Sequence, residues 1–202
     1  MGGLTQDAAG RLAQAVAAWT ASFAAVRRAA LPVLGAVALI LGTAACGGGG
    51  DDKTFKGEGI GITFTYPSAF KRIHDVSFRV TAGAKAAARA GVALDADNAI
   101  VVSRYDLRLA IKSANLAQFK DEVDAVIAKV AGRPVSGGRV DYGGLPGYEY
   151  TIPLANPADG RSHLVVLFDE AKEYLINCQS RPDKRDAVDA ACRQALDTLR
   201  PK

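Results

Sequence analysis

The sequence predicts an α+β fold in which two helices accompany a mainly antiparallel sheet. Two segments, 116–130 and 183–199, repeat apolar residues at the 3.6-residue spacing of a helix. Much of the chain after residue 60 instead reads as short extended runs, several with alternating apolar and polar residues. Short turns rich in Gly, Pro, Asn and Asp separate these runs, and such turns join antiparallel neighbours. Residues 60–202 are enough for one compact domain with its own core.

Three extended segments are expected before the first helix. Residues 60–66 alternate Ile and Phe with Gly and Thr until Pro67 ends the strand. Residues 76–80 form a weaker extended segment. Residues 99–107 contain the β-branched run Ile-Val-Val, which is typical of a buried strand.

The first helix is expected to start at Asn115, a residue type that caps helices, and to end before Gly132 and Pro134. One face of this helix is apolar and carries Leu116, Phe119, Val123, Val126, Ile127 and Val130. Four strands are expected to follow, at 135–142, 148–153, 162–169 and 172–179. Turns are expected between them, with turn-forming residues at 143–147, 156–160 and 169–172.

The last helix is expected at 183–199. Its apolar side carries Val188, Ala191, Cys192, Ala195 and Leu199. Charges alternate on its polar side, where Arg185 and Asp189 stand four residues apart. Such a pair contributes only a few tenths of a kcal/mol to helix stability.

The N-terminal part of the chain has the order of a secretory signal. Two arginines, residues 27–28, precede an uncharged, mostly apolar run at 29–42, then small residues and Cys46. This order resembles the bacterial lipoprotein signal, in which the cysteine receives a diacylglycerol and becomes the N-terminus. Thr43 stands where Leu is usual, so simple cleavage after Ala45 is the alternative. The apolar run is shorter than the ~20 residues that a membrane span needs.

The residues around this signal define the expected domain organisation. Residues 1–25 make an unusually long stretch before the arginines of a signal. Two explanations remain: translation begins at Val26, or the stretch forms an amphipathic helix. The arginine pair also allows twin-arginine export, although an ordinary positive start is simpler. We predict a signal peptide at 1–45, a lipidated cysteine with a flexible Gly-rich tether at 46–59, and a single domain at 60–202.

The charge pattern argues against a nucleic-acid partner. The chain has a formal net charge of +4, and it has no long Lys/Arg run, no zinc-ligand spacing and no aromatic-plus-basic motif. Basic residues nevertheless outnumber acids between Ser68 and Lys112. They could face anionic lipid head groups or an acidic partner, or form an ordinary solvated surface. If this segment faces lipid, the residues expected to contact the head groups are Lys71, Arg72, Lys85 and Arg89.

Several short motifs of this chain together resemble one known family. They are Phe-Thr-Tyr-Pro at 64–67, Gly-Leu-Pro-Gly-Tyr-Glu-Tyr at 144–150, Gly-Arg at 160–161, Tyr-Leu-Ile-Asn-Cys at 174–178 and Ala-Cys at 191–192. They resemble the PsbP-like superfamily, whose bacterial members include small actinobacterial lipoproteins of the LpqN and LpqT kind. The resemblance covers about residues 58–200. It implies an α/β/α sandwich, a central antiparallel sheet with helices on both faces. It also implies an accessory or binding protein without catalytic activity, and it indicates no ligand.

The sequence contains no recognised catalytic motif. His163 alternates with apolar residues in a strand and is expected to be partly buried, whereas His74 is expected in a solvated turn. Gly-x-Ser-x-Gly, His-Glu-x-x-His and phosphate-loop patterns are missing, and no cofactor or metal is predicted. The carboxylate pairs Asp121-Glu122 and Asp95 with Asp97 fit solvated positions, but two carboxylates are all that a glycosidase needs. An unrecognised carboxylate hydrolase is therefore one alternative.

The cysteines fit an exported protein. With Cys46 used by the anchor, Cys178 and Cys192 remain as an even pair in a compartment where disulfides persist. A closing helix packed on the sheet would bring them together. We predict a structural disulfide, whose loop corresponds to about 3 kcal/mol in the chain-entropy model.

These observations predict an extracytoplasmic lipoprotein held on the outer face of the cell membrane by Cys46. Its expected role is that of a non-catalytic binding or accessory module, with an envelope protein or component as its partner. An envelope carrier for a small apolar or amphipathic ligand is the other alternative. An apolar cavity of several hundred Å³ would favour the carrier.

Overall fold

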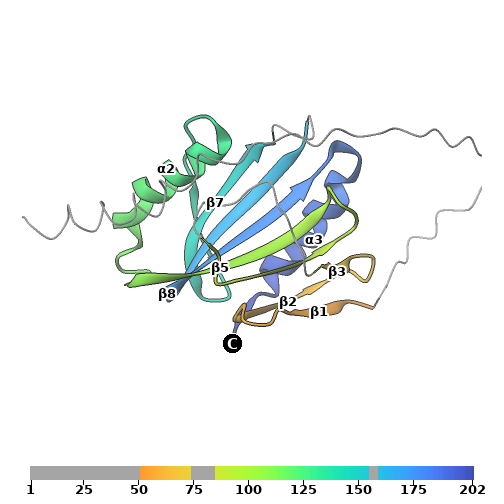
Figure 1. Ribbon diagram of the computed structural model, residues 1–202, viewed down its shortest axis with the longest axis horizontal. Helices are drawn as coiled ribbons and strands as arrows, with labels where there is room; N and C mark the ends of the chain where they lie inside the picture. The colour runs from red at the N-terminus through yellow and green to blue at the C-terminus, as the bar shows by residue number, and fades with distance from the viewer. Residues whose placement is uncertain (1–50, 74–84, 155–158) are drawn as a thin grey trace, which may run out of the picture.

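The computed structural model describes residues 51–73, 85–154 and 159–202 (Figure 1). The signal peptide, Cys46 and residues 47–50 of the tether lie outside these residues. So do the extended segment expected at 76–80, His74, and all but the end of the turn expected at 156–160. Within the described ranges, no helix has the length and apolar character that crossing a membrane requires.

The centre of the domain is a large antiparallel sheet (Figure 1). Its order is β3-β4-β5-β8-β7-β6, and every pairing between neighbours is antiparallel, as expected. The strands are β3 (Lys71–Ile73), β4 (Ala88–Ala93), β5 (Ala99–Ile111), β6 (Gly138–Tyr142), β7 (Leu145–Pro153) and β8 (Arg161–Ser180).

The long element β8 folds back on itself. Ser162 Oγ donates a hydrogen bond of 2.5 Å to Asn177 Oδ1, although a straight strand would separate these residues by about 50 Å. Glu170 has a positive φ of 52°, as a tight reversal requires. The first half of β8 therefore pairs with β7 and the second half with β5. The turn predicted at 169–172 is confirmed.

The turn between β6 and β7 is shorter than expected. Tyr142 pairs with Leu145, so only Gly143 and Gly144 form the loop, with φ of 64° and 80°. Two consecutive positive φ values are those of a type I′ hairpin. Pro146 and the residues beside it lie in β7, so the prediction of a Pro-Gly turn over 143–147 is wrong. The pairing of β6 with β7 continues through Pro146 and overrides its local turn preference.

A second, smaller antiparallel sheet has the order β1-β2-β9. It consists of β1 (Lys53–Lys56), β2 (Ile62–Tyr66) and β9 (Arg200–Pro201). The prediction of a flexible tether is therefore wrong for residues 53–56. The reason is Phe55, which is fully buried and stacks on Phe64 of the neighbouring strand with ring centroids 4.4 Å apart.

Both predicted helices are present. A 3₁₀ turn (Leu116–Phe119) leads into α2 (Lys120–Ala131), and a second 3₁₀ turn (Pro182–Lys184) leads into α3 (Arg185–Asp197). Gly132 ends α2 with a φ of 66°, in the left-handed conformation typical of helix ends. Asn115 does not cap the helix, because its side chain bonds to the Lys112 N–H and the Ala110 carbonyl instead.

The layers form the expected α/β/α sandwich, with helices on both faces of the central sheet (Figure 1). Successive residues of β8 point to opposite faces, so Val165 and Leu167 pack toward α3 while Leu164 and Val166 pack toward α2. The small sheet lies beside α3, where the Thr65 N–H donates a 2.9 Å hydrogen bond to the Thr198 hydroxyl. Apolar side chains fill the sheet's two faces, and burial of each large one contributes about 1.5–3 kcal/mol.

The predicted disulfide is present and joins α3 to the sheet. Cys178 of β8 and Cys192 of α3 are bonded, with their Cα atoms 6.0 Å apart. The ion pair predicted within α3 between Arg185 and Asp189 does not form. Asp189 instead pairs with Arg161 on β8, and Arg185 donates to the Asp159 carbonyl at 2.9 Å. A residue of β8 and a residue of the turn before it therefore replace the partners on the same helix.

Candidate functional site

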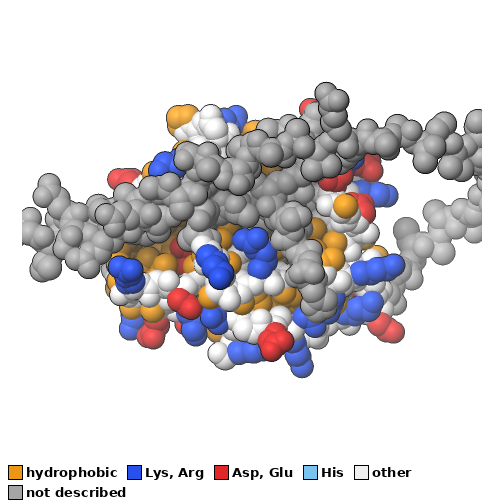
Figure 2. Space-filling model, in the orientation of Figure 1, with side chains coloured by type: hydrophobic (Ala, Val, Ile, Leu, Met, Phe, Trp, Pro, Cys, Tyr) orange, Lys and Arg blue, Asp and Glu red, His pale blue; other side chains and the backbone are white. Residues whose placement is uncertain are grey.

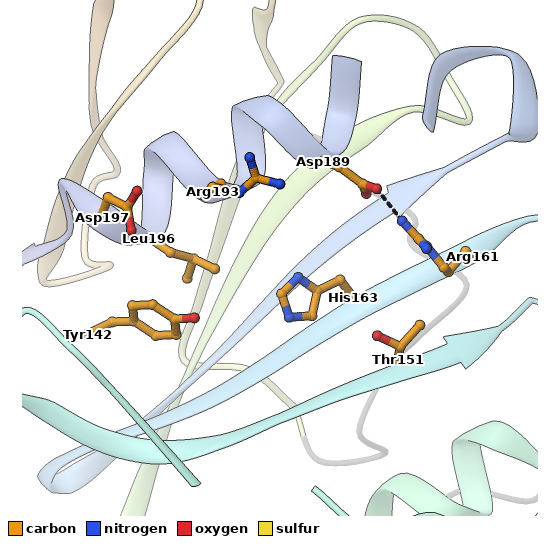
Figure 3. A pocket seen from close by; sticks show the side chains of 8 residues that line it. All are labelled: Tyr142, Thr151, Arg161, His163, Asp189, Arg193, Leu196 and Asp197. Atoms are coloured by element: carbon orange, nitrogen blue, oxygen red, sulfur yellow. Dashed lines mark hydrogen bonds and ion pairs between the residues drawn. The ribbon is translucent and has the colours of Figure 1, made fainter. Parts of the chain in front are cut away.

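A pocket of about 230 Å³ lies between α3 and the part of the large sheet formed by β6, β7 and β8 (Figure 3). The sheet and α3 contribute four lining residues each. Those from the sheet are Tyr142, Thr151, Arg161 and His163, and those from α3 are Asp189, Arg193, Leu196 and Asp197. Most of them are polar or charged.

His163 lies at the floor of the pocket, where the sequence predicts a partly buried strand histidine. Its side chain is 28% exposed, and its Nε2 is 3.2 Å from Glu149 Oε2. Its other ring nitrogen, Nδ1, lies 3.8 Å from the Sγ of Cys192. The imidazole therefore sits between a carboxylate on β7 and the disulfide that holds α3.

Glu149 connects this floor to the edge strand β6. The hydroxyl of Tyr142 donates a 3.3 Å hydrogen bond to Glu149 Oε2, the same oxygen that faces His163. Burial and the negative charge of Glu149 raise the pKa of Tyr142 above its usual value. The Tyr142 hydroxyl therefore keeps its proton at neutral pH and stays a donor.

The wall formed by α3 presents charges of alternating sign. Asp189, Arg193 and Asp197 follow one another at four-residue spacing, which places them along one side of the helix. Asp189 is bound by Arg161, which closes the pocket at the start of β8 (Figure 3). Leu196 adds an apolar side chain close to Tyr142 (Figure 3).

The four basic residues selected for lipid contact do not share one face. Lys71 stands opposite Ala93 in β4, whereas Arg72 stands opposite Val92 and its guanidinium lies over the ring of Phe55, 5.2 Å from the centroid. Neighbouring residues of a strand point to opposite faces, so the prediction of a common basic face is wrong for this pair. In the view of Figure 2, Lys and Arg side chains are spread over the visible surface with acidic side chains among them.

The other two selected residues differ in what they contact. Arg89 lies on the same face of β4 as Ala93, and its Nε donates a 3.0 Å hydrogen bond to the hydroxyl of Ser103. Lys85 is exposed and precedes β4. Lys71 and Arg89 therefore share a side of the sheet that Arg72 does not.

The carboxylates noted in the sequence have structural roles or solvated positions. Asp95 Oδ1 accepts hydrogen bonds from the N–H groups of Asp97 and Asn98 and from the Asn98 side chain. Burial alone would raise the pKa of Asp95, but these hydrogen bonds lower it below its usual value. Asp121 is exposed and Glu122 half-buried on α2. Within residues 51–73, 85–154 and 159–202, no three His, Cys, Asp or Glu side chains are grouped to bind a metal ion.

Among the pocket residues, the sequence pattern draws attention only to His163, and it predicts a partly buried strand histidine there. Arg161 belongs to the Gly-Arg motif of the family resemblance, and Asp189 lies on the polar side of the predicted last helix. No sequence pattern marks the other lining residues. They come from four elements and have no common spacing in the chain. Only the packing of α3 on the sheet brings them together.

No protein-family model matches the chain, and no curated protein matches it. A solved structure, cyanobacterial PsbP (CyanoP) from Synechocystis sp. PCC 6803, superimposes with a TM-score of 0.50 at 14% identity, covering 79% of this chain and 98% of that one. The domain has a PsbP-like fold. At this level of identity the likeness concerns the fold alone.

Two further solved structures resemble the chain. A crystal structure from Bacteroides thetaiotaomicron VPI-5482 gives a TM-score of 0.49 at 12% identity over 74% of this chain, which spans about half, 48%, of that protein. LpqN of Mycobacterium tuberculosis, described as involved in cell envelope biogenesis, gives a TM-score of 0.41 at 11% identity over 76% of this chain and 86% of that one.

Proposed function

We propose that this protein is a lipid-anchored lipoprotein on the outer face of the cell membrane, where its PsbP-like domain acts as a non-catalytic binding module of the envelope. The observation that carries the proposal is the signal order that ends at Cys46. Because β1 already begins at Lys53, only residues 47–52 separate the anchor from the folded domain. An extended chain of that length reaches about 20 Å. The anchored domain would therefore stay next to the bilayer.

The contacts of the pocket histidine support a binding role over a catalytic one. A histidine base that activates a nucleophilic side chain needs a hydroxyl or thiol within about 3 Å. The sulfur next to His163, that of Cys192, is already bonded to Cys178. Its other nitrogen, Nε2, faces the carboxylate of Glu149 at 3.2 Å. These contacts favour a histidine that holds the pocket in shape.

The packing of the core and the lining of the pocket bear on the two alternative functions, an envelope carrier and a carboxylate hydrolase. Side chains from α3 and the small sheet occupy one face of the large sheet, and those around α2 occupy the other. The pocket beside α3 is lined mostly by polar groups, which favours a polar ligand over the apolar cargo of a carrier. Of the pocket acids, Asp189 is engaged by Arg161. Asp189 is therefore not available as a catalytic carboxylate, which argues against the hydrolase alternative.

The proposal is tested by replacing the anchor residue. Cells expressing the wild-type chain and a Cys46→Ser variant would be labelled with radioactive palmitate and separated into membrane and soluble fractions. We expect label and membrane retention for the wild type only, because two acyl chains give durable anchoring at about 0.8 kcal/mol per buried CH₂. A Thr43→Leu variant is the matched control and should be processed at least as well.

Two results would contradict the anchor. One is an unlabelled wild-type protein, which would indicate ordinary cleavage and a released domain. The other is a Cys46→Ser variant that stays in the membrane fraction with the same processed mass as the wild type.

A further inference from the structure

We infer that the pocket between α3 and strands β6 to β8 binds a neutral, hydroxyl-rich ligand the size of a single sugar ring. The inference rests on the proposed binding function and deepens it by naming the site and the class of ligand. Its basis is the charge balance, the size and the rigidity of the pocket.

The charges of the pocket compensate one another. Arg161 is paired with Asp189. On α3, Arg193 is followed four residues later by Asp197. An anion would approach Arg193 but meet the two aspartates, and a cation would meet the two guanidiniums in turn. Electrostatics of this kind disfavour both, whereas a neutral ligand is not repelled.

The polar groups suit neighbouring hydroxyls. A guanidinium donates through several N–H groups in a fixed plane, and a carboxylate accepts through two oxygens. A hydroxyl is both a donor and an acceptor, so adjacent hydroxyls on one ring can satisfy an arginine and an aspartate that stand side by side. Arg161 and Asp189 stand in this way, and their side chains remain 34% and 31% exposed. The hydroxyl of Thr151 lies on the same side of the pocket (Figure 3).

The apolar part of the pocket suits the carbon face of a sugar. The ring of Tyr142 and the side chain of Leu196 lie next to each other at the end away from Arg161 (Figure 3). Aromatic and aliphatic surfaces bury C–H groups while the polar groups fix orientation. The pocket volume of about 230 Å³ is below the range of about 300–1,000 Å³ that is usual for drug-sized ligands. One ring is therefore a better fit than a larger ligand.

The pocket is held rigid before any ligand arrives. The disulfide of Cys192 and the ion pair of Arg161 both tie α3 to β8. On the other wall, Glu149 joins Tyr142 on β6 to His163 on β8. Side chains that are already ordered lose little conformational entropy on binding, which favours affinity for a small ligand.

The inference is tested by saturation-transfer NMR on the mature protein that the cells produce, in a detergent without sugar groups. The probes are glucose, arabinose and N-acetylglucosamine, with inorganic phosphate and glycine as the anionic and zwitterionic comparisons. We expect saturation transfer to at least one sugar and no competition by phosphate or glycine. Arg193→Gln and Asp189→Asn should each weaken sugar binding about tenfold or more, since each removes hydrogen bonds to a charged group.

The matched control is Lys129→Gln, an exposed position in the last turn of α2 on the other face of the sheet. This variant should bind the sugar like the wild type. Near-ultraviolet circular dichroism and the mass after alkylation would verify that each variant is folded with its disulfide intact. The inference is overturned by a lack of saturation transfer to any of the three sugars, by sugar binding equal to wild type in folded Arg193→Gln and Asp189→Asn variants, or by displacement of the sugar by phosphate or glycine. A failure of palmitate labelling would contradict the anchor and leave this result standing.

Discussion

His163 lies against the disulfide, with its Nδ1 3.8 Å from the Sγ of Cys192. Both cysteines are almost completely buried, with exposures of 2% for Cys178 and 1% for Cys192. The imidazole thus covers the bond on the side of the pocket. The covalent link that holds α3 on the sheet is therefore also part of the floor of the candidate binding site.

We expect loss of the disulfide to destabilise the domain by about 3 kcal/mol, because the bond closes a loop of about 15 residues. The two cysteines are separated by 14 positions in the chain. Urea unfolding of a Cys178→Ala, Cys192→Ala double variant against the wild type would measure the difference. Intact mass before and after alkylation is the accompanying check. Two alkylated thiols in wild-type protein from the envelope would contradict the bond.

The ion pair between Arg161 and Asp189 is expected to couple by about 0.5–1 kcal/mol, since both side chains are partly shielded from water. A double-mutant cycle with Arg161→Met and Asp189→Asn would measure the coupling from urea unfolding. The control cycle uses Lys112 and Glu170, whose side chains are 62% and 69% exposed. That pair should couple by about zero. Equal coupling in both cycles would show that the contact between β8 and α3 adds no stability.

Gly147 is expected to tolerate no side chain. A Cβ added there would lie 1.9 Å from the carbonyl oxygen of Val166 on the neighbouring strand. Gly147→Ala should therefore cost about 3 kcal/mol or more, or prevent folding, because the backbone of β7 or β8 must move. Gly138→Ala is the control, since its Cβ would have its nearest neighbour at 3.9 Å. Similar unfolding midpoints for the two variants would contradict the close approach of the strands.

Asp124 should make stability depend on pH in the acid range. Burial by itself would raise the pKa of Asp124, but hydrogen bonds from Lys120, the Gly137 N–H and Tyr150 lower it below its usual value. A lowered native pKa adds stability above the unfolded pKa of about 4 and loses it as the pH falls through the native pKa.

The measurement is urea unfolding between pH 7 and pH 2. Wild type should lose stability more steeply below about pH 4 than an Asp124→Asn variant, which has no proton to bind at this position. Asp121→Asn, an exposed residue of the same helix, serves as the control and should follow the wild-type slope. Parallel slopes for wild type and Asp124→Asn would refute the expected contribution.

Vesicle binding should reflect the division of the basic residues between two faces. Lys71 and Arg89 share a side of the sheet, and Arg72 points to the other. A bilayer can therefore contact the first two together, at about 1 kcal/mol each, without Arg72. Sedimentation of the mature Cys46→Ser protein with anionic and neutral vesicles would measure the attraction.

The two variants change residues on opposite faces of the sheet. Lys71→Glu with Arg89→Glu should reduce sedimentation with anionic vesicles at low salt, while Arg72→Glu should leave it unchanged. The attraction should also weaken as the Debye length falls from about 10 Å at 0.1 M salt to about 3 Å at 1 M. Equal sedimentation with both vesicle types would identify these residues as an ordinary solvated surface.

The sequence predicted the elements whose signal is local. The spacing of apolar residues in α2 and α3 identifies their buried faces, because the residues of a helix that face the core recur about every 3.6 positions. The turn at Glu170 was also predicted, because a short polar run must reverse a chain between two apolar strands. The disulfide followed once Cys178 was assigned to a strand and Cys192 to the helix that packs on it.

The predictions that failed depend on partners far away in the chain. Strand β1 has one apolar residue in four, so its pattern is weak, and it forms because Phe55 stacks on Phe64. Pro146 and Gly147 have the composition of a turn, yet both lie in β7, paired with β6. Local preference amounts to about a kcal/mol per residue, and the pairing and burial of a whole strand exceed it.

By itself the sequence determined the fold class, the order of most elements and the pair of cysteines, and it predicts an export signal, because each is written in neighbouring residues. Only the tertiary structure decided that Asp189 pairs with Arg161 instead of Arg185, that Lys71 and Arg72 face opposite ways, and that a pocket with compensated charges lies beside α3. These features depend on how α3 and the strands pack. Contacts between distant segments carry no periodicity that a sequence can display, and they form only where burial brings those segments together.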